Sequence, residues 1–177
     1  MRTILATLCV AALVAPAAFA AEPSATPTPT QACKALRTTM GVQFASVYKT
    51  LGACISSKSG QAALNLQNAA KQCKAEMAMT PAAFTAAHGG KTFAQFYGLN
   101  ANQKNAYGKC VSLKASAAAQ QQLAAEISAA KKCKAMRADA GFAAAHTGKT
   151  FKEFFGTGAN KSNAYGRCVA QLAKAAG

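Results

Sequence analysis

The chain has 177 residues, of which 20 are Lys or Arg, 5 are Asp or Glu and 2 are His, giving a formal net charge of +15 at pH 7. So few carboxylates and histidines provide poorly for general acid–base or hydrolytic catalysis. A charge this high predicts attraction to polyanions that weakens as salt is added. The alternative is that the charge only keeps an alanine-rich protein in solution.

The first twenty residues are typical of a secretory signal peptide. Arg2 gives a short positively charged start, residues 3–14 form an apolar stretch too short to span a bilayer, and residues 18–20 match an A-x-A cleavage site. We expect cleavage after residue 20 and a secreted or cell-envelope-associated protein; an uncleaved N-terminal anchor is the alternative. Cleavage would remove Arg2 and no acid, and so leave a charge of +14.

Residues 21–32 hold three of the five prolines together with several threonines. This composition disfavours a helix and cannot bury a core. We therefore expect a Pro/Thr-rich extended spacer.

One block of sequence then occurs twice, and a third time in shortened form. Residues 73–111 and 133–169 both open with Cys-Lys-Ala and close with Tyr-Gly-Lys/Arg-Cys-Val, whereas residues 33–55 keep only the two ends. Features that recur in every copy usually build the structural unit. Repetition therefore predicts architecture here and leaves the activity open.

Six cysteines follow the predicted signal, and an even number in an exported protein indicates disulfides. Residues 111–132 lack Pro and Gly and predict one helix, which would hold Cys110 and Cys133 about 34 Å apart, too far for a bond. Zinc binding is the alternative, but no C-x-x-C pair is present, so we predict no metal. The simplest scheme pairs the cysteines within each unit, as Cys33–Cys54, Cys73–Cys110 and Cys133–Cys168.

The sequence of each full unit predicts four elements in the order helix, short helix, short helix, helix. In residues 73–111, Thr80 precedes a proline and should begin one short helix, and Thr92 should begin another that ends at Gly98. Asn100 or Asn102 should then cap the helix that carries the closing cysteine.

The aromatic residues of each unit predict a small core beneath the disulfide. Phe93 and Phe96 lie three residues apart on one helical face, as do Phe151 and Phe154. An aromatic binding platform is the alternative. The first unit keeps only Phe44 and Tyr48 between its cysteines, so we expect a helical hairpin that caps the array.

Two kinds of polar residue recur and are candidates for binding or catalysis. His88 and His146 each precede a glycine turn, where a histidine suits a helix C-terminus; catalysis would need an acid such as Glu76 or Glu153 to reach them. Asparagines recur at the same spacing before the closing cysteine, where they should cap a helix or bind a ligand together with a lysine. The candidate ligand-binding residues are Lys91, Asn102, Asn105, Lys149, Asn160 and Asn163.

The string Asn-x-x-Asn-Ala-Tyr-Gly-Lys/Arg-Cys-Val, after an upstream Cys-Lys-Ala, resembles a block in uncharacterised exported cysteine-repeat proteins of high-GC Gram-positive bacteria. There it often reads CKAE…DPAAF…YGTN…NAFGKCVS. Residues 73–112 match best, residues 133–169 have Gly-Phe in place of the Pro-Ala-Ala-Phe start, and residues 33–54 match only at their ends. The resemblance implies export and a repeat architecture, and it assigns no catalytic residues.

The sequence therefore predicts an all-α fold of tandem disulfide-stapled helical repeat units joined by helical connectors. The leading functional prediction is a non-enzymatic cationic protein, without a cofactor, that binds anionic cell-envelope polymers or extracellular nucleic acid. The alternative is a structural or protein-interaction module whose charge only gives solubility. The expected segments are the signal peptide 1–20, the spacer 21–32, a short unit 33–55, a connector helix 56–72, a unit 73–111, a connector helix 112–132 and a unit 133–177.

Overall fold

The structure, a computed structural model, describes residues 26–176, and all of its regular elements in that range are helices. The predicted signal peptide and residues 21–25 of the predicted spacer lie outside the described residues. No helix in the range 26–176 is long and apolar enough to span a bilayer.

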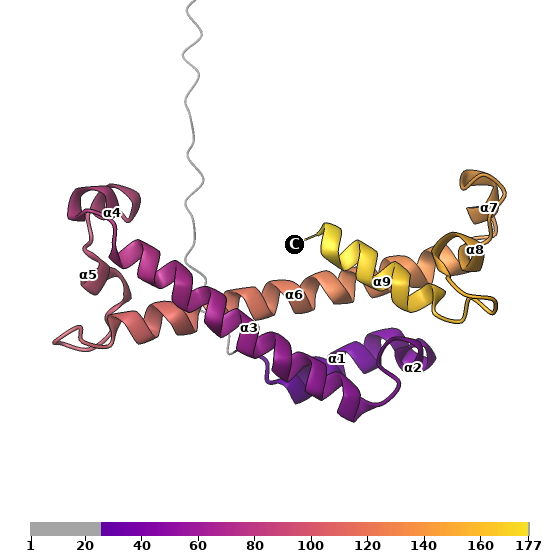
Figure 1. Ribbon diagram of the computed structural model, residues 1–177, viewed down its shortest axis with the longest axis horizontal. Coiled ribbons are helices and arrows are strands. Elements are labelled where there is room, and N and C mark those ends of the chain that lie inside the picture. The colour runs from indigo at the N-terminus through magenta and orange to yellow at the C-terminus, as the bar shows by residue number, and fades with distance from the viewer. Residues whose placement is uncertain (1–25, 177) are drawn as a thin grey trace, which may run out of the picture.

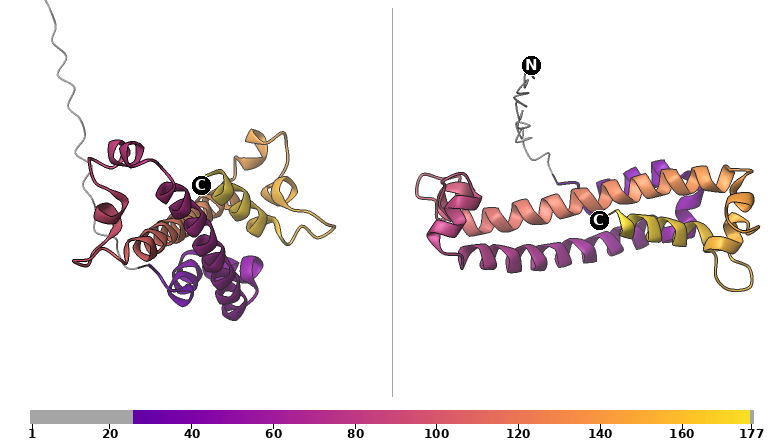
Figure 2. Two further views of the ribbon diagram at one scale, coloured as in Figure 1. Left: turned by 60° about the vertical axis from the view of Figure 1, so that its left-hand side comes forward. Right: turned by 90° about the horizontal axis from the view of Figure 1, so that it is seen from above.

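Two long helices, α3 (Leu51–Met77) and α6 (Ala106–Ala138), form the shaft of an elongated rod (Figure 1). They run in opposite directions along each other (Figure 2). The 33 residues of α6 correspond to a length of about 50 Å. Helix α1 (Pro29–Met40) packs against both long helices, and α9 (Ala164–Ala175) returns along the second half of α6.

Short helices fill the bends at the two ends of the rod. One end holds α4 (Pro81–Ala87) and α5 (Phe93–Tyr97), between the two long helices. The opposite end holds α7 (Phe142–Ala145) and α8 (Phe151–Phe155), together with the bend after α1. That bend consists of η1 (Gly41–Gln43) and α2 (Phe44–Tyr48).

Three disulfides tie consecutive long elements together, and they join the pairs that the sequence predicts. Their S–S distances are 2.05 Å for Cys33–Cys54, 1.99 Å for Cys73–Cys110 and 2.00 Å for Cys133–Cys168. The six cysteines that form these bonds are fully buried. Because α3 carries two of these cysteines and α6 another two, each long helix is fixed near both of its ends. Residues 56–72 lie within the uninterrupted length of α3, and residues 112–132 lie within that of α6.

The spacer prediction is wrong at its C-terminal side, because α1 begins at Pro29 inside the segment expected to be extended. Thr28 is the N-cap, and its hydroxyl oxygen accepts the backbone N–H of Gln31. The Gln31 side-chain oxygen in turn accepts the N–H of Thr28, which completes a capping box. A proline in the first turn lacks only an N–H that would have no helical partner, so it starts the helix here.

The apolar core is divided between the two ends of the rod. The larger cluster joins α1, α2, the start of α3, the second half of α6, and α7 to α9, and it includes Leu36, Phe142 and Tyr165. The smaller cluster surrounds the Cys73–Cys110 disulfide at the α4–α5 end. Each disulfide at a bend therefore lies inside the apolar packing that it holds together.

Between these clusters most side chains of the shaft are alanines and amides. Asn65 of α3 is only 4% exposed, and it is the one buried polar side chain among residues 26–176. Its amide exchanges two hydrogen bonds with Gln122 of α6, at 3.0 and 3.1 Å. A reciprocal amide pair is satisfied at one register only, so it fixes how the two helices align.

The aromatic prediction is wrong for Phe96 and Phe154, which remain 43% and 48% exposed. The residue after each of them is buried instead, Tyr97 in one unit and Phe155 in the other. These helices are only five residues long and lie across the rod, so one ring points inward and its neighbour covers the outside. The predicted starts at Thr80 and Thr92 are correct, since each hydroxyl accepts a backbone N–H.

Candidate functional site

The four carboxylates among the described residues are all engaged in holding the fold. Glu76 accepts the Tyr97 hydroxyl at 2.8 Å and lies 2.8 Å from Lys114 Nζ. Partial burial alone would raise the pKa of Glu76, but the hydrogen bonds from Lys114 and Tyr97 outweigh it and lower the pKa. This carboxylate therefore stays ionised and connects α3, α5 and α6.

Glu126 forms an equivalent group nearer the opposite end. It accepts the Tyr48 hydroxyl at 2.9 Å and pairs with Lys58, so it connects α6, α2 and α3. Burial, followed by the nearby Glu126 charge, raises the pKa of Tyr48 well above its usual value. Neither group is predictable from the sequence, because each partner lies 21 to 78 residues from its carboxylate.

The two remaining acids act locally in turns. Asp139 accepts the Gly141 N–H at 2.8 Å in the bend after α6. Glu153 accepts the backbone N–H and the hydroxyl of Thr150 in the capping box of α8, and these bonds lower the pKa of Glu153. No carboxylate in the range 26–176 is thus left without a structural role.

The positive side chains are in large excess over these acids. Of the 20 Lys and Arg residues, 19 lie among the described residues, and only Lys58 and Lys114 form salt bridges there. Most of the others are exposed. Unpaired, solvated cations of this density attract polyanions.

These cations gather at the two ends of the rod. The α4–α5 end has six cations and one acid, Glu76, a net charge of +5. Its cations are Lys71, Lys74, Lys91, Lys104, Lys109 and Lys114.

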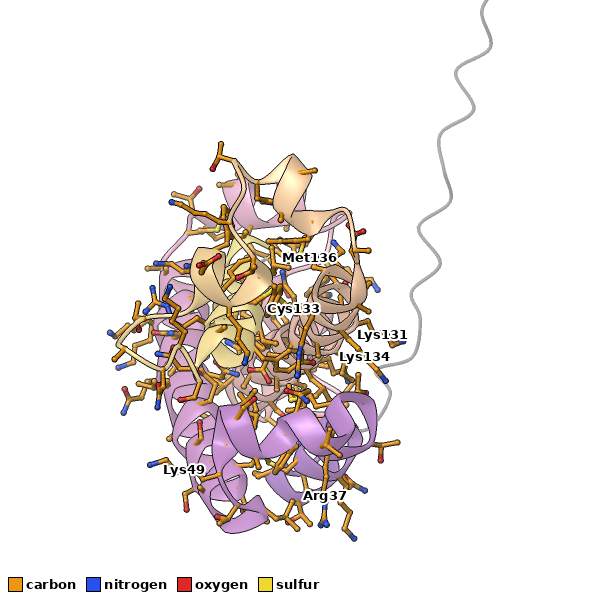
Figure 3. The ribbon with its side chains drawn as sticks, turned by 90° about the vertical axis from the view of Figure 1, so that its right-hand side faces the viewer. Arg37, Lys49, Lys131, Cys133, Lys134 and Met136 are labelled. Carbon is orange, nitrogen blue, oxygen red and sulfur yellow. A yellow bond between two sulfur atoms is a disulfide. The ribbon has the colours of Figure 1, made fainter. Side chains whose placement is uncertain are left out.

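The α7–α8 end has eleven cations and two acids, Asp139 and Glu153, a net charge of +9. Viewed from this end, Lys131 and Lys134 project from α6 on one side, and Arg37 and Lys49 lie below them (Figure 3). The cations are Lys34, Arg37, Lys49, Lys131, Lys132, Lys134, Arg137, Lys149, Lys152, Lys161 and Arg167.

Between the two ends, residues 59–70 of α3 and 115–130 of α6 contain no Lys or Arg. We refer to these two ranges as the waist. Its only acid is Glu126, whose charge is balanced by Lys58, and Lys174 at the end of α9 is the one other cation outside the two ends. The charge is therefore distributed in two separate groups.

A cavity of about 440 Å³ opens at the α7–α8 end, where the end of α6 faces η1. Lys134 and Arg137 supply positive charge to it, and no carboxylate lines it. Burial raises the pKa of the Tyr165 phenol in its wall, and the positive charge of Arg137 opposes that rise. The Tyr165 hydroxyl donates to the Ala130 carbonyl, so the phenol is already satisfied. The remaining walls, Met40–Gln43 and Ala138, carry no charged side chain.

The predicted asparagine caps are wrong, because none of these side chains caps its helix. Helix α6 begins after Asn105, whose side-chain oxygen instead accepts the Leu99 N–H at 3.2 Å, across the loop. Asn163 accepts the Thr157 N–H at 3.0 Å in the corresponding loop before α9. Each loop turns at a residue with positive φ, Gln103 in the first and Lys161 in the second. The side chains of Asn105 and Asn163 therefore face the interior of their own loops.

The other two predicted asparagines also stabilise the loops. Asn102 accepts the N–H of Lys104 at 3.1 Å, and Asn160 accepts the N–H of Ser162 at 3.3 Å. Neither Lys91 nor Lys149 is hydrogen-bonded to an asparagine in the described part of the chain. Both lysines are exposed after glycine turns, where they add to the charge of their respective ends.

The two histidines occupy matching aromatic clusters. The His88 ring stacks on Phe84 with centroids 3.9 Å apart, and its Nδ1 lies 3.0 Å from the Phe84 carbonyl oxygen. His146 stacks on Phe142 at 3.8 Å with the same backbone contact at 2.8 Å. Each histidine lies at the C-terminal end of its short helix, α4 or α7. Neither ring is hydrogen-bonded to a carboxylate among residues 26–176, although the charge of His88 is one of the causes that lower the pKa of Glu76.

No three His, Cys, Asp or Glu side chains in the described range gather so that they could hold a metal ion. No protein-family model matches the chain, and no curated protein or solved structure is significantly similar to it.

Proposed function

We propose that this is a non-enzymatic, cationic protein of the cell envelope or the extracellular space that binds anionic polymers through the two ends of its rod. One observation carries the proposal: the acids among residues 26–176 are all used inside the fold, whereas 17 of the 19 cations there have no carboxylate partner. Such a surface favours ligands with many regularly spaced negative charges over a single small anion.

Export is part of the same proposal. Three buried disulfides suit an oxidising compartment, and thiols in the cytosol are normally kept reduced. The signal-like residues 1–20 agree with this location.

We also propose that residues 33–55, 73–111 and 133–177 are tandem repeat units of the exported cysteine-repeat type. The support is a set of contacts that the second and third units share. Besides the two histidine stacks, a Cβ at Gly98 would lie 2.7 Å from Gln103 Cβ, and a Cβ at Gly156 would lie 2.6 Å from Lys161 Cβ. The first unit has a simpler bend built on Phe44 and Tyr48.

Retention on immobilised polymers over a salt series tests the proposal. Beads coated with teichoic acid, peptidoglycan or DNA distinguish the sources of negative charge. We expect retention at low salt and release as salt rises, and the strongest retention identifies the polymer. Retention that salt does not change, or no retention on any polymer, would contradict the proposal.

A charge variant and a matched neutral variant make this test specific. Replacing Arg37, Lys131, Lys134 and Arg137 with Gln removes four exposed cations of the α7–α8 end and should weaken retention. Replacing Ser59, Gln67 and Asn68 with Ala changes only exposed neutral positions of the waist and should leave retention unchanged.

The second candidate function is a structural or protein-interaction module whose charge only gives solubility. The observation in its favour is that the cations occur at both ends and are not gathered on one continuous face. This candidate predicts that the charge variant and the neutral variant behave alike on every polymer.

A further inference from the structure

The two cationic ends act as electrostatically separate sites. Lys114 and Lys131, the cations of α6 that border the waist, are 17 residues apart and hence about 25 Å apart along the helix. The Debye length in physiological salt is about 8 Å. Charge bound at one end therefore has little influence on the other.

The rod also keeps its ends apart mechanically. Helices α3 and α6 continue through the waist without a break, and the Asn65–Gln122 pair fixes their alignment. A disulfide links α3 and α6 directly at the α4–α5 end, and the other two disulfides fasten α1 and α9 to the shaft. No hinge in the described elements would let the two ends close on a single ligand.

We propose that the protein bridges two separate segments of anionic polymer, one held at each end of the rod. This inference rests on the proposed polymer binding and adds a two-site stoichiometry to it. A single strand laid along the rod would cross the waist, where most side chains are Ala, Ser, Gln, Asn or Leu and the charge of the only acid, Glu126, is balanced by Lys58. Over that length such a strand would meet Lys174 as the one cation without a carboxylate partner, whereas separate segments make their contacts where the cations are numerous.

Two variants isolate the ends. Replacing Lys71, Lys74, Lys91 and Lys104 with Gln lowers the α4–α5 end from +5 to +1. The α7–α8 end carries more charge, so Arg37, Lys131, Lys134 and Arg137 are replaced with Glu, which lowers that end from +9 to +1. All eight side chains are exposed, and thermal unfolding of each variant checks that the fold is kept.

The first measurement is the binding stoichiometry of a linear polyphosphate too short to reach across the waist. We expect two equivalents per molecule of the full protein and one equivalent for each variant. One equivalent for the unmodified protein would overturn the inference.

The second measurement is cross-linking of long polyphosphate chains, followed by light scattering at a protein concentration below saturation. The unmodified protein should assemble the chains into large particles, and either variant should bind them without assembly. Binding without assembly by the unmodified protein would overturn bridging and leave the proposed function intact. No binding to any polyanion would overturn both.

Discussion

Tyr97 donates its hydroxyl hydrogen to Glu76 Oε2 at 2.8 Å, on the carboxylate whose other oxygen pairs with Lys114. The phenol comes from a five-residue helix, the carboxylate from α3 and the ammonium from α6. The group thus attaches a helix too short to be stable alone to the shaft of the rod.

Replacing Tyr97 with Phe should lower the free energy of unfolding by about 1–2 kcal/mol, because it removes one hydrogen bond to a charged acceptor. Tyr107→Phe is the matched control, since its hydroxyl lies 3.4 Å from the Ala70 carbonyl oxygen and contributes a weaker bond. Denaturant unfolding measures both. Equal losses for the two variants would contradict the role given to Glu76.

The same contact predicts how stability depends on alkaline pH. Burial and the hydrogen bond to Glu76 raise the pKa of Tyr97 above its ordinary value of 10.0, and burial with the Glu126 charge does the same for Tyr48. A raised pKa in the folded state means that the stability is complete below pH 10 and is lost progressively above it. Ultraviolet titration should show phenols that ionise later in the folded protein than in the unfolded one.

At acid pH the dependence of stability on pH has the opposite direction, because stability is lost as the pH falls. The folded pKa of Glu76 is lowered, so its contribution is present above the ordinary value of 4.5 and is lost as the pH falls through the lower folded value. Melting temperature should therefore fall in this range, and less steeply in a Glu76→Gln variant. An identical acid profile for that variant would show that another group is responsible.

Two glycines predict opposite effects of the same substitution. A Cβ at Gly98 would lie 2.7 Å from Gln103 Cβ, so Gly98→Ala forces the loop apart and should cost about 1–3 kcal/mol. Gly60 is in the interior of α3, and no atom other than those of its chain neighbours and its own helix backbone lies within 4 Å of an added Cβ, so Gly60→Ala should stabilise by about 0.5–1 kcal/mol. Thermal unfolding compares them. Stabilisation by both would mean that the loop does not approach Gly98.

The Cys73–Cys110 disulfide closes the smaller of the two cores. Replacing both cysteines with Ala should cost about 3–4 kcal/mol in the chain-entropy view. Hydrogen exchange should rise mainly in residues 78–105, because the larger core at the opposite end does not depend on this bond. A uniform rise along the rod would indicate that the two ends unfold as one unit.

The sequence alone predicted the helical class and the cysteine pairing, because both depend on local information. An uninterrupted helix between Cys110 and Cys133 excludes the competing bond, and threonines such as Thr80 begin helices through contacts three residues away. The composition of the spacer predicts an extended chain at Pro29, but the capping box of Thr28 and Gln31 starts a helix there.

Contacts between distant segments cannot be predicted from this sequence alone. Nothing in the order of residues brings Tyr48 to Glu126 or Asn65 to Gln122, since those contacts arise only when α3 and α6 align. The separation of charge into two groups is visible in the sequence only after the connectors are recognised as the middle of a rod. Asn105 and Asn163 do not cap their helices, because the turn before each helix directs their side chains toward the loop.

The most direct test of polymer binding is the slope of log K against log salt for the full protein and a long polyanion. Several contacts at a cationic end should give a slope of about −3 or steeper, since each neutralised phosphate contributes about −0.7 to −0.9. A slope near zero, with binding retained, would contradict the account.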